Sequence, residues 1–511
     1  MTGISVDGIF CKAETTNGWI EGIVSAGVCQ FKAVPYGADT GGRARFGPPA
    51  RPVSWSGVRP CFGYGMVSPQ VPSDPASAYV QLIQYEQAVA EGGMGEDCLK
   101  LNIWAPEAPG AKRPVIVSIH GGGFAISSGN ARIYDGTQFA MRGEVVVVTI
   151  THRLAAFGHL NLADLGGGEA YAAAGAAGLL DLVLALEWVR DNISVFGGDP
   201  ERVLLLGQSG GGWKISALLA MSQARGLFHC AGVLSGSLPR LLSREDAAAA
   251  AAGLIAELGL SHATLERLHE LPWQALLNAQ TKLGAMWFQP FVDGNFLPAH
   301  PCDPRAPEQS RDVPLVISTT LDDAGLFFSN FTLTEDGLKD LLGAAYGDVA
   351  PRMLALYRAR WPHKSPHLLH AQIITDSGFR RFAYEQAERT SERGGAPVYL
   401  YQWNWTTPAF DGRFGATHAS DVAAAFGNHR DAIIGAGSKT GAKLCTAAMA
   451  MWTGFAATGD PNTAALPHWP VFDMARRATL IFDTDLQIAD DPDQEVRLFW
   501  KDMPPAKSVF G

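Results

Sequence analysis

The stretch that decides the fold reads Val203-Leu204-Leu205-Leu206-Gly207-Gln208-Ser209-Gly210-Gly211. Its four apolar residues predict a short buried strand. The Gly-x-Ser-x-Gly pentapeptide that follows is typical of a nucleophile elbow, a sharp strand-to-helix turn that presents a serine hydroxyl. Glycines suit such a turn because they tolerate both a strained backbone and a closely packed helix. Alone the pentapeptide is weak evidence, because Gly-rich turns between strands and helices also occur by chance.

A second glycine-rich loop lies upstream. The run Val115-Ile116-Val117-Ser118-Ile119 predicts a strand, and His120-Gly121-Gly122-Gly123-Phe124 follows it. Such an HGGG loop supplies backbone N–H groups to an oxyanion hole, together with the N–H of the residue after the serine. One such donor can be worth about 2.7–4 kcal/mol in the transition state. A flexible turn or a phosphate-binding loop is the alternative, but neither a Gly-Lys-Ser/Thr ending nor a GxGxxG register is present.

A nucleophilic serine needs a general base, and the base needs an acid to orient it. In α/β folds with this elbow the chain order is serine, acid, histidine. After Ser209, the strand-like run of residues 313–318 leads to Asp322 and Asp323, and a Gly-rich loop further on carries His418. The two acids at a strand end are candidate orienters. The alternative for His418 is an ordinary histidine of a surface loop.

Motifs in the same order cover nearly the whole chain and resemble those of one family. They comprise Val34-Pro35-Tyr36-Gly37, Arg45-Phe46, Glu96 to Trp104, the HGGGF loop, Thr151 to Leu154, Phe157-Gly158, Gly178 to Asp181, Ala185 to Val189, Asn192-Ile193, Phe196 to Pro200, Ser235-Gly236-Ser237, Val292-Asp293-Gly294, Gly459 to Asn462 and Trp469-Pro470. This set is similar to that of the type B carboxylesterases, the cholinesterase-like branch of the α/β-hydrolases. The resemblance implies an α/β-hydrolase fold with a large, mostly parallel sheet flanked by helices. It also implies a serine-dependent carboxylic ester hydrolase.

The resemblance assigns roles to particular positions. Ser209 is expected to be the nucleophile, His418 the general base and Asp323 the orienting acid, with Asp322 as the alternative. The family usually has Glu at the position of Asp323, so the carboxylate here is one methylene shorter. The oxyanion hole is expected to comprise the N–H groups of Gly122, Gly123 and Gly210. The resemblance also implies that Glu96 and Arg153 form a buried ion pair behind the site.

The chain departs from the family pattern near the elbow. Gln208 stands where the family usually has Glu, and Gly210 where it usually has Ala. Lys214 stands where a small residue is usual, and we hypothesise that a carboxylate holds it or that it lines the pocket floor. The alternative is an amphipathic stem that reaches water. His152 and His159 replace Tyr and Phe, and we expect them to be supporting or core groups rather than catalysts.

Length and composition fit one large α/β unit. The chain has 511 residues and is 47% hydrophobic, and the motifs spread over all of it, which predicts a single domain over residues 1–511. Residues 239–312 and 327–395 are expected to be helical insertions that cap the active site. The Ala-rich stretch Ala247 to Leu260 predicts a helix within the first insertion. Residues Ala478 to Phe482 predict a strand, and a terminal helix or arm is expected after it.

The net charge and the cysteine content limit the possible binding partners and the possible cellular compartment. A net charge of −10 disfavours a nucleic-acid surface, and no apolar run approaches the ~20 residues of a membrane span. Seven cysteines leave at least one unpaired, and by the resemblance the usual partner position of Cys98 holds Ser68. With no basic and apolar leader in residues 1–22, the expected location is the reducing cytoplasm. We expect no metal and no organic cofactor, and a monomer or a homodimer.

The natural substrate is the least determined property. Candidate pocket residues are Phe124, Trp213, Trp287, Phe288 and Phe291, although each is also compatible with ordinary core packing. In the family, the three-glycine loop accompanies roomy alcohol sites. We therefore expect small to medium carboxylic esters. Acyl transfer, carbamate or amide hydrolysis with the same triad, a specialised toxin- or antibiotic-ester hydrolase and a non-catalytic binding protein are the alternatives.

Overall fold

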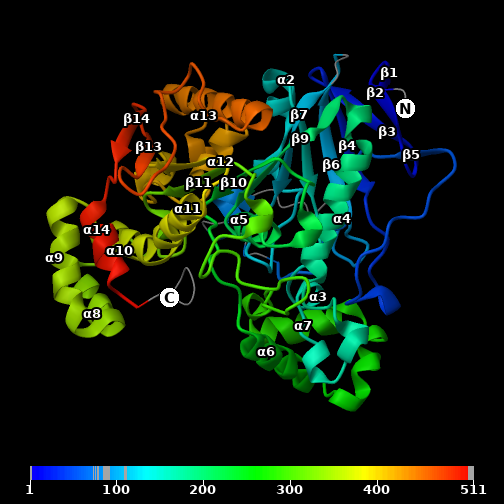
Figure 1. Cartoon of the computed structure of the whole chain (residues 1–511), viewed down its shortest axis with the longest axis horizontal. Helices are drawn as coiled ribbons and strands as arrows, with labels where there is room; N and C mark the ends of the chain where they lie inside the picture. Colours follow the sequence, from blue (N-terminus) through cyan, green and yellow to red (C-terminus); the bar gives the residue numbers. More distant parts are fainter. Residues whose placement is uncertain are drawn as a thin grey trace.

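A computed structural model describes residues 3–72, 74, 76–77, 80–84, 92–108 and 112–504. In this part of the chain fourteen strands form one sheet, ordered β1-β2-β3-β4-β6-β8-β7-β9-β10-β11-β12-β13-β14, with β5 paired to β3 (Figure 1). The strands are β1 (Ser5–Asp7), β2 (Phe10–Thr15), β3 (Gly18–Ser25), β4 (Val28–Pro35), β5 (Val58–Pro60), β6 (Lys100–Pro106), β7 (Arg113–Ile119), β8 (Val146–Ile150), β9 (Gly198–Gln208), β10 (Cys230–Leu234), β11 (Leu315–Thr320), β12 (Val398–Trp403), β13 (Ala478–Phe482) and β14 (Gln487–Asp490).

The centre of the sheet is parallel and its flanks are largely antiparallel. From β8 through β7, β9, β10, β11 and β12 to β13, every neighbouring pair is parallel. Parallel strands need crossover connections, and helices supply them on both faces. Strands covered on both faces show apolar runs instead of alternation, as in Val203-Leu204-Leu205-Leu206 of β9.

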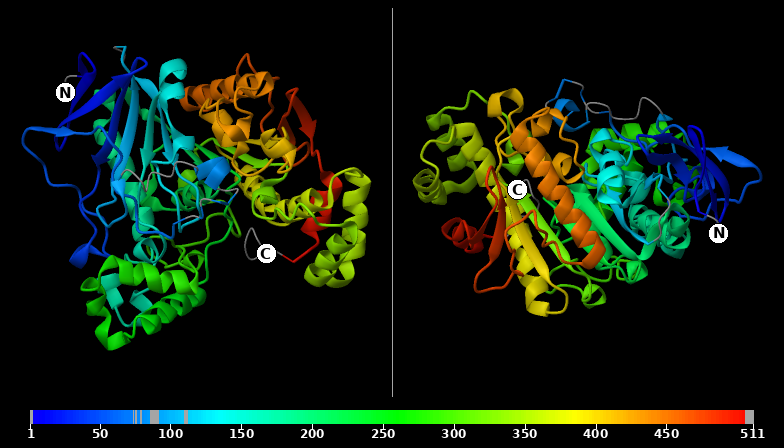
Figure 2. Two further views of the ribbon diagram at one scale, coloured as in Figure 1. Left: turned by 180° about the vertical axis from the view of Figure 1, so that it is seen from behind. Right: turned by 90° about the horizontal axis from the view of Figure 1, so that it is seen from above.

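Two helical layers cover the two faces of the sheet (Figures 1 and 2). The helices are α2 (Thr137–Gly143), α3 (Ala155–Gly158), α4 (Ala177–Asn192), α5 (Gly210–Leu219), α6 (Arg244–Glu257), α7 (Trp273–Leu283), α8 (Glu335–Tyr346), α9 (Ala350–Arg360), α10 (Pro366–Thr375), α11 (Arg381–Arg393), α12 (Ser420–Ala425), α13 (Lys439–Thr458) and α14 (Gln494–Lys501). Helices α4, α5 and α11 share one core with Val117 and Leu205. Helices α2, α12 and α13 share the other core with Ile116 and Leu204, so neighbouring residues of one strand serve opposite layers.

The two expected insertions are largely helical. Residues 239–312 contain α6 and α7, which lie in the green lobe at the bottom of Figure 1. Their residues, such as Leu254 and Leu276, share one core with the segment that begins at α3, through residues such as Phe157. The helix predicted from the Ala-rich stretch is α6, which begins after Ser243, whose hydroxyl accepts from the N–H of Asp246. Residues 327–395 contain α8 to α11, and α8 and α9 pack with α14. Their role as caps stays a prediction.

The C-terminal elements match the prediction closely. The expected strand Ala478 to Phe482 is β13, and helix α14 follows β14. Within the described residues no single helix is long and apolar enough to cross a membrane. The bent pair of α6 and the 3₁₀ helix His262–His269, which meet at 74°, passes the same test of length and composition.

Candidate active site

Ser209 lies in the turn between β9 and α5, at the carboxyl end of the central parallel strands. Its backbone has φ 56° and ψ −127°, a conformation that costs a non-glycine residue free energy. The turn is held by the Ser209 N–H, which donates to the carbonyl of Leu234 at 2.8 Å, and by the Trp213 N–H, which donates to the Ser209 carbonyl at 3.0 Å. The strained turn therefore presents the serine side chain beside the first turn of α5, as the sequence predicts.

The glycine loop after β7 packs directly against this turn. Gly122 and Gly123 have φ values of 78° and 60°, a region that glycine adopts without steric cost. A Cβ placed on Gly210 would lie only 2.4 Å from the nitrogen of Gly123. The absence of a side chain at residue 210 thus lets the two backbone segments touch, and this is the position at which the family usually has Ala.

The N–H groups of the predicted oxyanion hole are unoccupied by protein acceptors. Within the described chain, the N–H groups of Gly122, Gly123 and Gly210 make no hydrogen bond, whereas the Gly121 N–H donates to the Tyr134 hydroxyl at 2.9 Å. Gly122 and Gly123 line the same cavity as Ser209 and His418. This arrangement leaves backbone donors free to bind a developing negative charge.

His418 and Asp323 meet at the ends of two segments far apart in the sequence. Nδ1 of His418 lies 2.8 Å from Oδ1 of Asp323, and both side chains are buried. The other carboxylate oxygen of Asp323 accepts hydrogen bonds from the Ser235 hydroxyl at 2.8 Å and from the Thr320 N–H at 2.9 Å. These donors hold the carboxylate in a position where it can orient the imidazole. The sequence did not identify Ser235 as a partner, although it opens the Ser235-Gly236-Ser237 motif.

Asp322, the alternative acid, has different partners. It forms a buried ion pair with Lys364 and accepts a hydrogen bond from the Ala416 N–H at 3.1 Å. These contacts fasten the loop that carries His418 to the end of β11. The geometry therefore distinguishes the two neighbouring acids: one contacts the histidine and the other fixes its loop.

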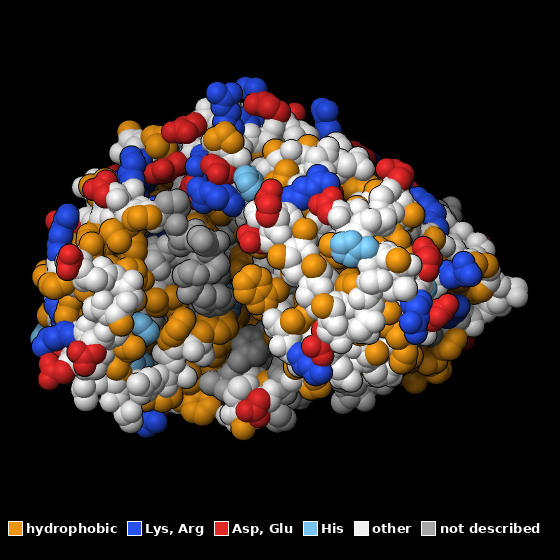
Figure 3. Space-filling model, turned by 90° about the horizontal axis from the view of Figure 1, so that it is seen from below, with side chains coloured by type: hydrophobic (Ala, Val, Ile, Leu, Met, Phe, Trp, Pro, Cys, Tyr) orange, Lys and Arg blue, Asp and Glu red, His pale blue; other side chains and the backbone are white. Residues whose placement is uncertain are grey.

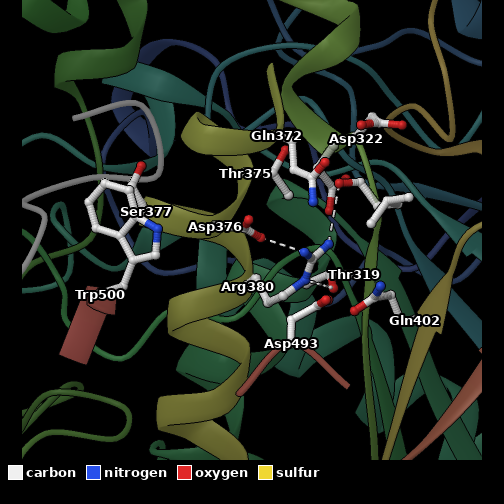
Figure 4. A network of polar contacts seen from close by, with 12 residues as sticks. Thr319, Asp322, Gln372, Thr375, Asp376, Ser377, Arg380, Gln402, Asp493 and Trp500 are labelled. Atoms are coloured by element: carbon white, nitrogen blue, oxygen red, sulfur yellow. Dashed lines mark hydrogen bonds and ion pairs between the residues drawn. The ribbon is translucent and has the colours of Figure 1, made fainter. Parts of the chain in front are cut away.

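A buried arginine supports the strand end that bears the acid (Figure 4). Arg380 pairs with Asp376, and it donates from Nη2 to the Thr320 carbonyl at 2.8 Å and from Nε to the Thr319 hydroxyl at 3.3 Å. Burial raises the pKa of Asp376 to about 7, and the Arg380 guanidinium opposes that shift. The backbone of Thr320 is thus bonded to Asp323 through its N–H and to Arg380 through its carbonyl.

A largely apolar cavity of about 420 Å³ opens onto Ser209 and His418. It is lined by Val71, Ile83, Gly121, Gly122, Gly123, Ala125, Ile126, Ser127, Ala131, Ile133, Tyr134, Gln208, Ser209, Trp213, Ala285, Met286, Phe327 and His418. Viewed from below, the molecule is hollowed near its centre and hydrophobic side chains border the hollow (Figure 3). Both insertions contribute to the lining, through Met286 and Phe327.

Of the aromatic residues expected in the pocket, only Trp213 lines this cavity. Phe124 is buried behind the glycine loop, where its ring lies 5.2 Å from that of His159. Phe288 is 1% exposed in the core of the first insertion, and Trp287 is 58% exposed. Phe291 is buried against Gly175. The expectation that these four aromatic residues line the pocket is therefore wrong. The packing of the first insertion turns Met286 toward the cavity instead, and the local sequence does not reveal that direction.

Lys214 occupies neither of the positions expected for it. Its side chain is fully buried, so it does not reach water, and it makes no ion pair with a carboxylate among the described residues. Instead Nζ donates to the backbone carbonyls of His120 at 3.0 Å and Gly121 at 3.5 Å. Burial lowers the pKa of Lys214 to about 7. The residue belongs to the far side of the glycine loop and is absent from the cavity lining.

The expected ion pair between Glu96 and Arg153 is wrong. Glu96 pairs with Arg45, at 2.5 Å and 2.6 Å for the two nitrogen–oxygen contacts. Arg153 pairs with Asp181 of α4, whose carboxylate accepts from Nη2 at 2.6 Å and from Nε at 2.9 Å. Charge-assisted paired hydrogen bonds form only at short range. Each arginine therefore pairs with the carboxylate that lies near it in the folded chain.

All seven cysteines lie in the described chain, where they are buried and unpaired. Cys98 is among these free cysteines, and the Ser68 hydroxyl accepts from the Leu154 N–H at 3.2 Å. No group of His, Cys, Asp and Glu side chains in the described residues has the arrangement of a metal site.

Comparison with known proteins identifies the family. The sequence model of the Carboxylesterase family matches residues 11–500. A para-nitrobenzyl esterase of Bacillus subtilis (strain 168) is 36% identical over 94% of this chain and 97% of its own length. A phenmedipham hydrolase of Pseudarthrobacter oxydans is 31% identical over 94% of this chain and 96% of its own length.

Solved structures agree with these sequence relatives. The carboxylesterase EST55 of Geobacillus stearothermophilus superposes with a TM-score of 0.83 at 35% identity, covering 96% of this chain and 99% of that one. An esterase of Clostridium hathewayi, described as hydrolysing aliphatic aromatic polyesters, gives a TM-score of 0.81 at 30% identity over 98% and 99% of the two chains. The expected α/β-hydrolase fold is confirmed. The chain therefore belongs to the carboxylesterase family, as a bacterial-type member, and is a serine-dependent carboxylic ester hydrolase.

Proposed function

We propose that Ser209, His418 and Asp323 are the catalytic triad of this hydrolase. The observation that carries the proposal is the 2.8 Å contact between His418 Nδ1 and Asp323, made beside the strained turn that presents Ser209. With Nδ1–H donated to the carboxylate, Nε2 keeps the lone pair that a general base needs. A buried acid, a buried base and a partly exposed elbow serine thus occur in the order in which the proton must move.

The reaction follows in two halves. Nε2 of His418 takes the proton of the Ser209 hydroxyl as Oγ bonds to the ester carbonyl carbon, and the oxyanion binds the N–H groups of Gly122, Gly123 and Gly210. The ester C–O bond then breaks, and the alcohol leaves with the proton from His418. Water attacks the acyl-enzyme by the same proton path and releases the acid, which restores Ser209.

The cavity supports small to medium esters with an apolar acyl or alcohol group. Its volume of about 420 Å³ and its lining by Ile126, Ile133, Met286 and Phe327 favour aliphatic or small aromatic groups. Among the described residues, the side chains that line it carry no carboxylate or ammonium group, so a charged substrate group would be desolvated without a partner there.

The test is hydrolysis of p-nitrophenyl esters from acetate to decanoate by the wild type and Ser209→Ala. We expect turnover that Ser209→Ala abolishes, with a maximum at short to medium acyl chains. Phosphonylation of the wild type by a p-nitrophenyl phosphonate, read by mass spectrometry, should map to Ser209. Turnover by Ser209→Ala equal to that of the wild type would refute the triad.

We further propose that the protein works in the cytoplasm as a monomer or homodimer. Seven unpaired, buried thiols support a reducing compartment, where such thiols persist. Light scattering coupled to size-exclusion chromatography gives the mass in solution, and a tetramer or larger species would contradict the second part.

A further inference from the structure

Three departures from the family pattern, distant in the sequence, meet behind the glycine loop. Lys214 on α5, His152 after β8 and His159 after α3 lie together with His120, and we call these four residues the Lys214 cluster. The rings of His120 and His152 stack with centroids 4.9 Å apart. Nζ of Lys214 lies 5.9 Å from the centre of the Phe124 ring. The centres of the Phe124 and His159 rings are 5.2 Å apart. All four members of the cluster are buried.

The lysine acts on the backbone of the oxyanion loop. Nζ donates to the carbonyl of Gly121 at 3.5 Å, and Nδ1 of His120 lies 2.9 Å from the same oxygen. That carbonyl belongs to the peptide group whose N–H is the N–H of Gly122. In a trans peptide the two groups point in opposite directions. Donors on the carbonyl side therefore fix the direction of the Gly122 N–H on the cavity side, and they polarise it toward an acceptor.

The surroundings of the lysine are polar, and no carboxylate of the described residues is bonded to it. Each imidazole has Nδ1 near a backbone carbonyl: His120 at Gly121, His152 at Arg153 (2.8 Å) and His159 at Gly175 (3.3 Å). Nε2 of all three rings has no hydrogen-bond partner in the described chain.

Burial and the charge of Lys214 lower the pKa of each of these histidines, so the rings are neutral with free lone pairs at Nε2. The nearby guanidinium of Arg153 is neutralised by Asp181. Below about pH 7, where Lys214 keeps its proton, the cluster thus combines one ammonium group with three uncharged acceptors.

We propose that Lys214 is a positioning residue for ester hydrolysis, which holds the Gly121–Gly122 peptide from behind so that the Gly122 N–H binds the oxyanion. The inference rests on the proposed oxyanion hole. A positive charge behind the loop gains interaction energy only when negative charge develops on the substrate oxygen, because the ground-state carbonyl is neutral. Its effect is therefore expected in kcat and in the affinity for transition-state analogues, with little effect on KM.

The experiment compares the wild type with Lys214→Met, which keeps the length of the buried stem and removes the ammonium group. Below pH 7, where Lys214 is protonated, we expect kcat on p-nitrophenyl butyrate to fall by about 10-fold or more, against about 100- to 1000-fold when a whole oxyanion donor is lost. KM is expected to stay within about 2-fold. The Ki of an alkyl trifluoromethyl ketone, which forms an oxyanion with the serine, should rise in parallel with the loss of kcat/KM, while the Ki of the matching methyl ketone stays unchanged.

Two controls separate positioning from folding. Ser216→Ala alters another buried polar residue of α5, which bonds Gln386 and not the glycine loop, and it should leave kcat unchanged. The melting temperature of Lys214→Met should equal or exceed that of the wild type, because a buried charge without a carboxylate partner is removed. Should Lys214→Met fail to fold, Lys214→Gln, which keeps an uncharged donor, is expected to lower kcat by a smaller factor.

The outcomes are distinct. Unchanged kcat and unchanged trifluoromethyl ketone affinity in a folded Lys214→Met or Lys214→Gln protein would overturn the role of the lysine. Equal weakening of both ketones would also overturn it, because that pattern indicates a general loss of pocket shape. Turnover that survives in Ser209→Ala refutes the triad itself, whatever Lys214→Met shows.

Discussion

The side-chain amide nitrogen of Gln208 lies 2.9 Å from Nε2 of His418. In the proposed triad this is the ring nitrogen that accepts the proton of Ser209, and no hydrogen bond joins it to Ser209 in the described structure. The amide donates to the lone pair and keeps it occupied until a substrate displaces it. Catalytic hydrogen bonds are often completed only when the substrate binds. Gln208 therefore holds the side chain of the base by a hydrogen bond on the side that faces the cavity.

Replacement of Gln208 by Glu is expected to shift the pH dependence of the reaction. A carboxylate beside Nε2 stabilises the protonated imidazolium of His418, so a higher pH is needed to obtain the free base. The acid limb of the plot of kcat/KM against pH should move to higher pH by about 1 unit. Rates with p-nitrophenyl acetate between pH 5 and 9 measure it. Gln208→Met, with no charge, is the matched control, and an identical acid limb in all three proteins would contradict the contact.

Substitution of Asp323 and of Asp322 should affect different properties of the protein. In Asp323→Asn the amide cannot hold His418 in the required tautomer, so kcat should fall by up to about 10⁴-fold with the fold retained. In Asp322→Asn, turnover should stay within a few-fold of the wild type, while the free energy of unfolding in urea falls because Lys364 loses its buried partner. Full activity in Asp323→Asn with loss in Asp322→Asn would reverse the assignment.

Gly210→Ala should impair catalysis although Ala is the usual residue of the family there. The added Cβ would lie 2.4 Å from Gly123, so the glycine loop must move away from the elbow. We expect kcat to fall at least about 10-fold, because fixed oxyanion donors lose their alignment. The matched control is Gly343→Ala on the exposed face of α8, where a Cβ meets no atom within 4 Å. It should gain about 0.5–1 kcal/mol of stability at unchanged kcat.

The buried lysine should make stability depend on pH in an identifiable window. Burial lowers the pKa of Lys214 to about 7, whereas the unfolded chain keeps an ordinary lysine near pH 10.4. Between these values the unfolded state binds more protons, so the folded state gains stability as pH rises, by up to about 1.4 kcal/mol per pH unit. The free energy of unfolding of Lys214→Met, in urea at pH 7, 8 and 9, should lack this increment. The groups that face Lys214 are the neutral His120, His152 and His159 and the paired Arg153, and none of them explains a change in that window.

An equal pH dependence in the wild type and Lys214→Met would show that the lysine keeps its ordinary titration. It would also show that the ammonium group is more solvated than its buried position indicates. The control at pH 6, where both states of the wild type hold the lysine proton, should show the largest advantage of the methionine variant.

The glycine-rich motifs and their order along the chain, together with the family resemblance, predicted the framework of the proposed site, because that framework depends on backbone geometry at strand ends. Glycines around Ser209 and at Gly122 and Gly123 fit positive φ values and close backbone approach, which few other residues tolerate. The order of Ser209, Asp323 and His418 along the chain follows the order of the strands that carry them. The fold class, the helix α6 and the strand β13 were predictable for the same reason, because short-range pattern and propensity determine them.

Tertiary structure decided which side chains meet. Arg153 pairs with Asp181 and not with Glu96, and the cavity takes Met286 and Phe327 while Trp287 faces outward. Lys214 is buried against two carbonyls, a position that its neighbours in the sequence do not indicate. Such contacts join residues that are 28 to 94 positions apart. Their free energies depend on distances of a few ångströms, which only the packing of complete elements sets.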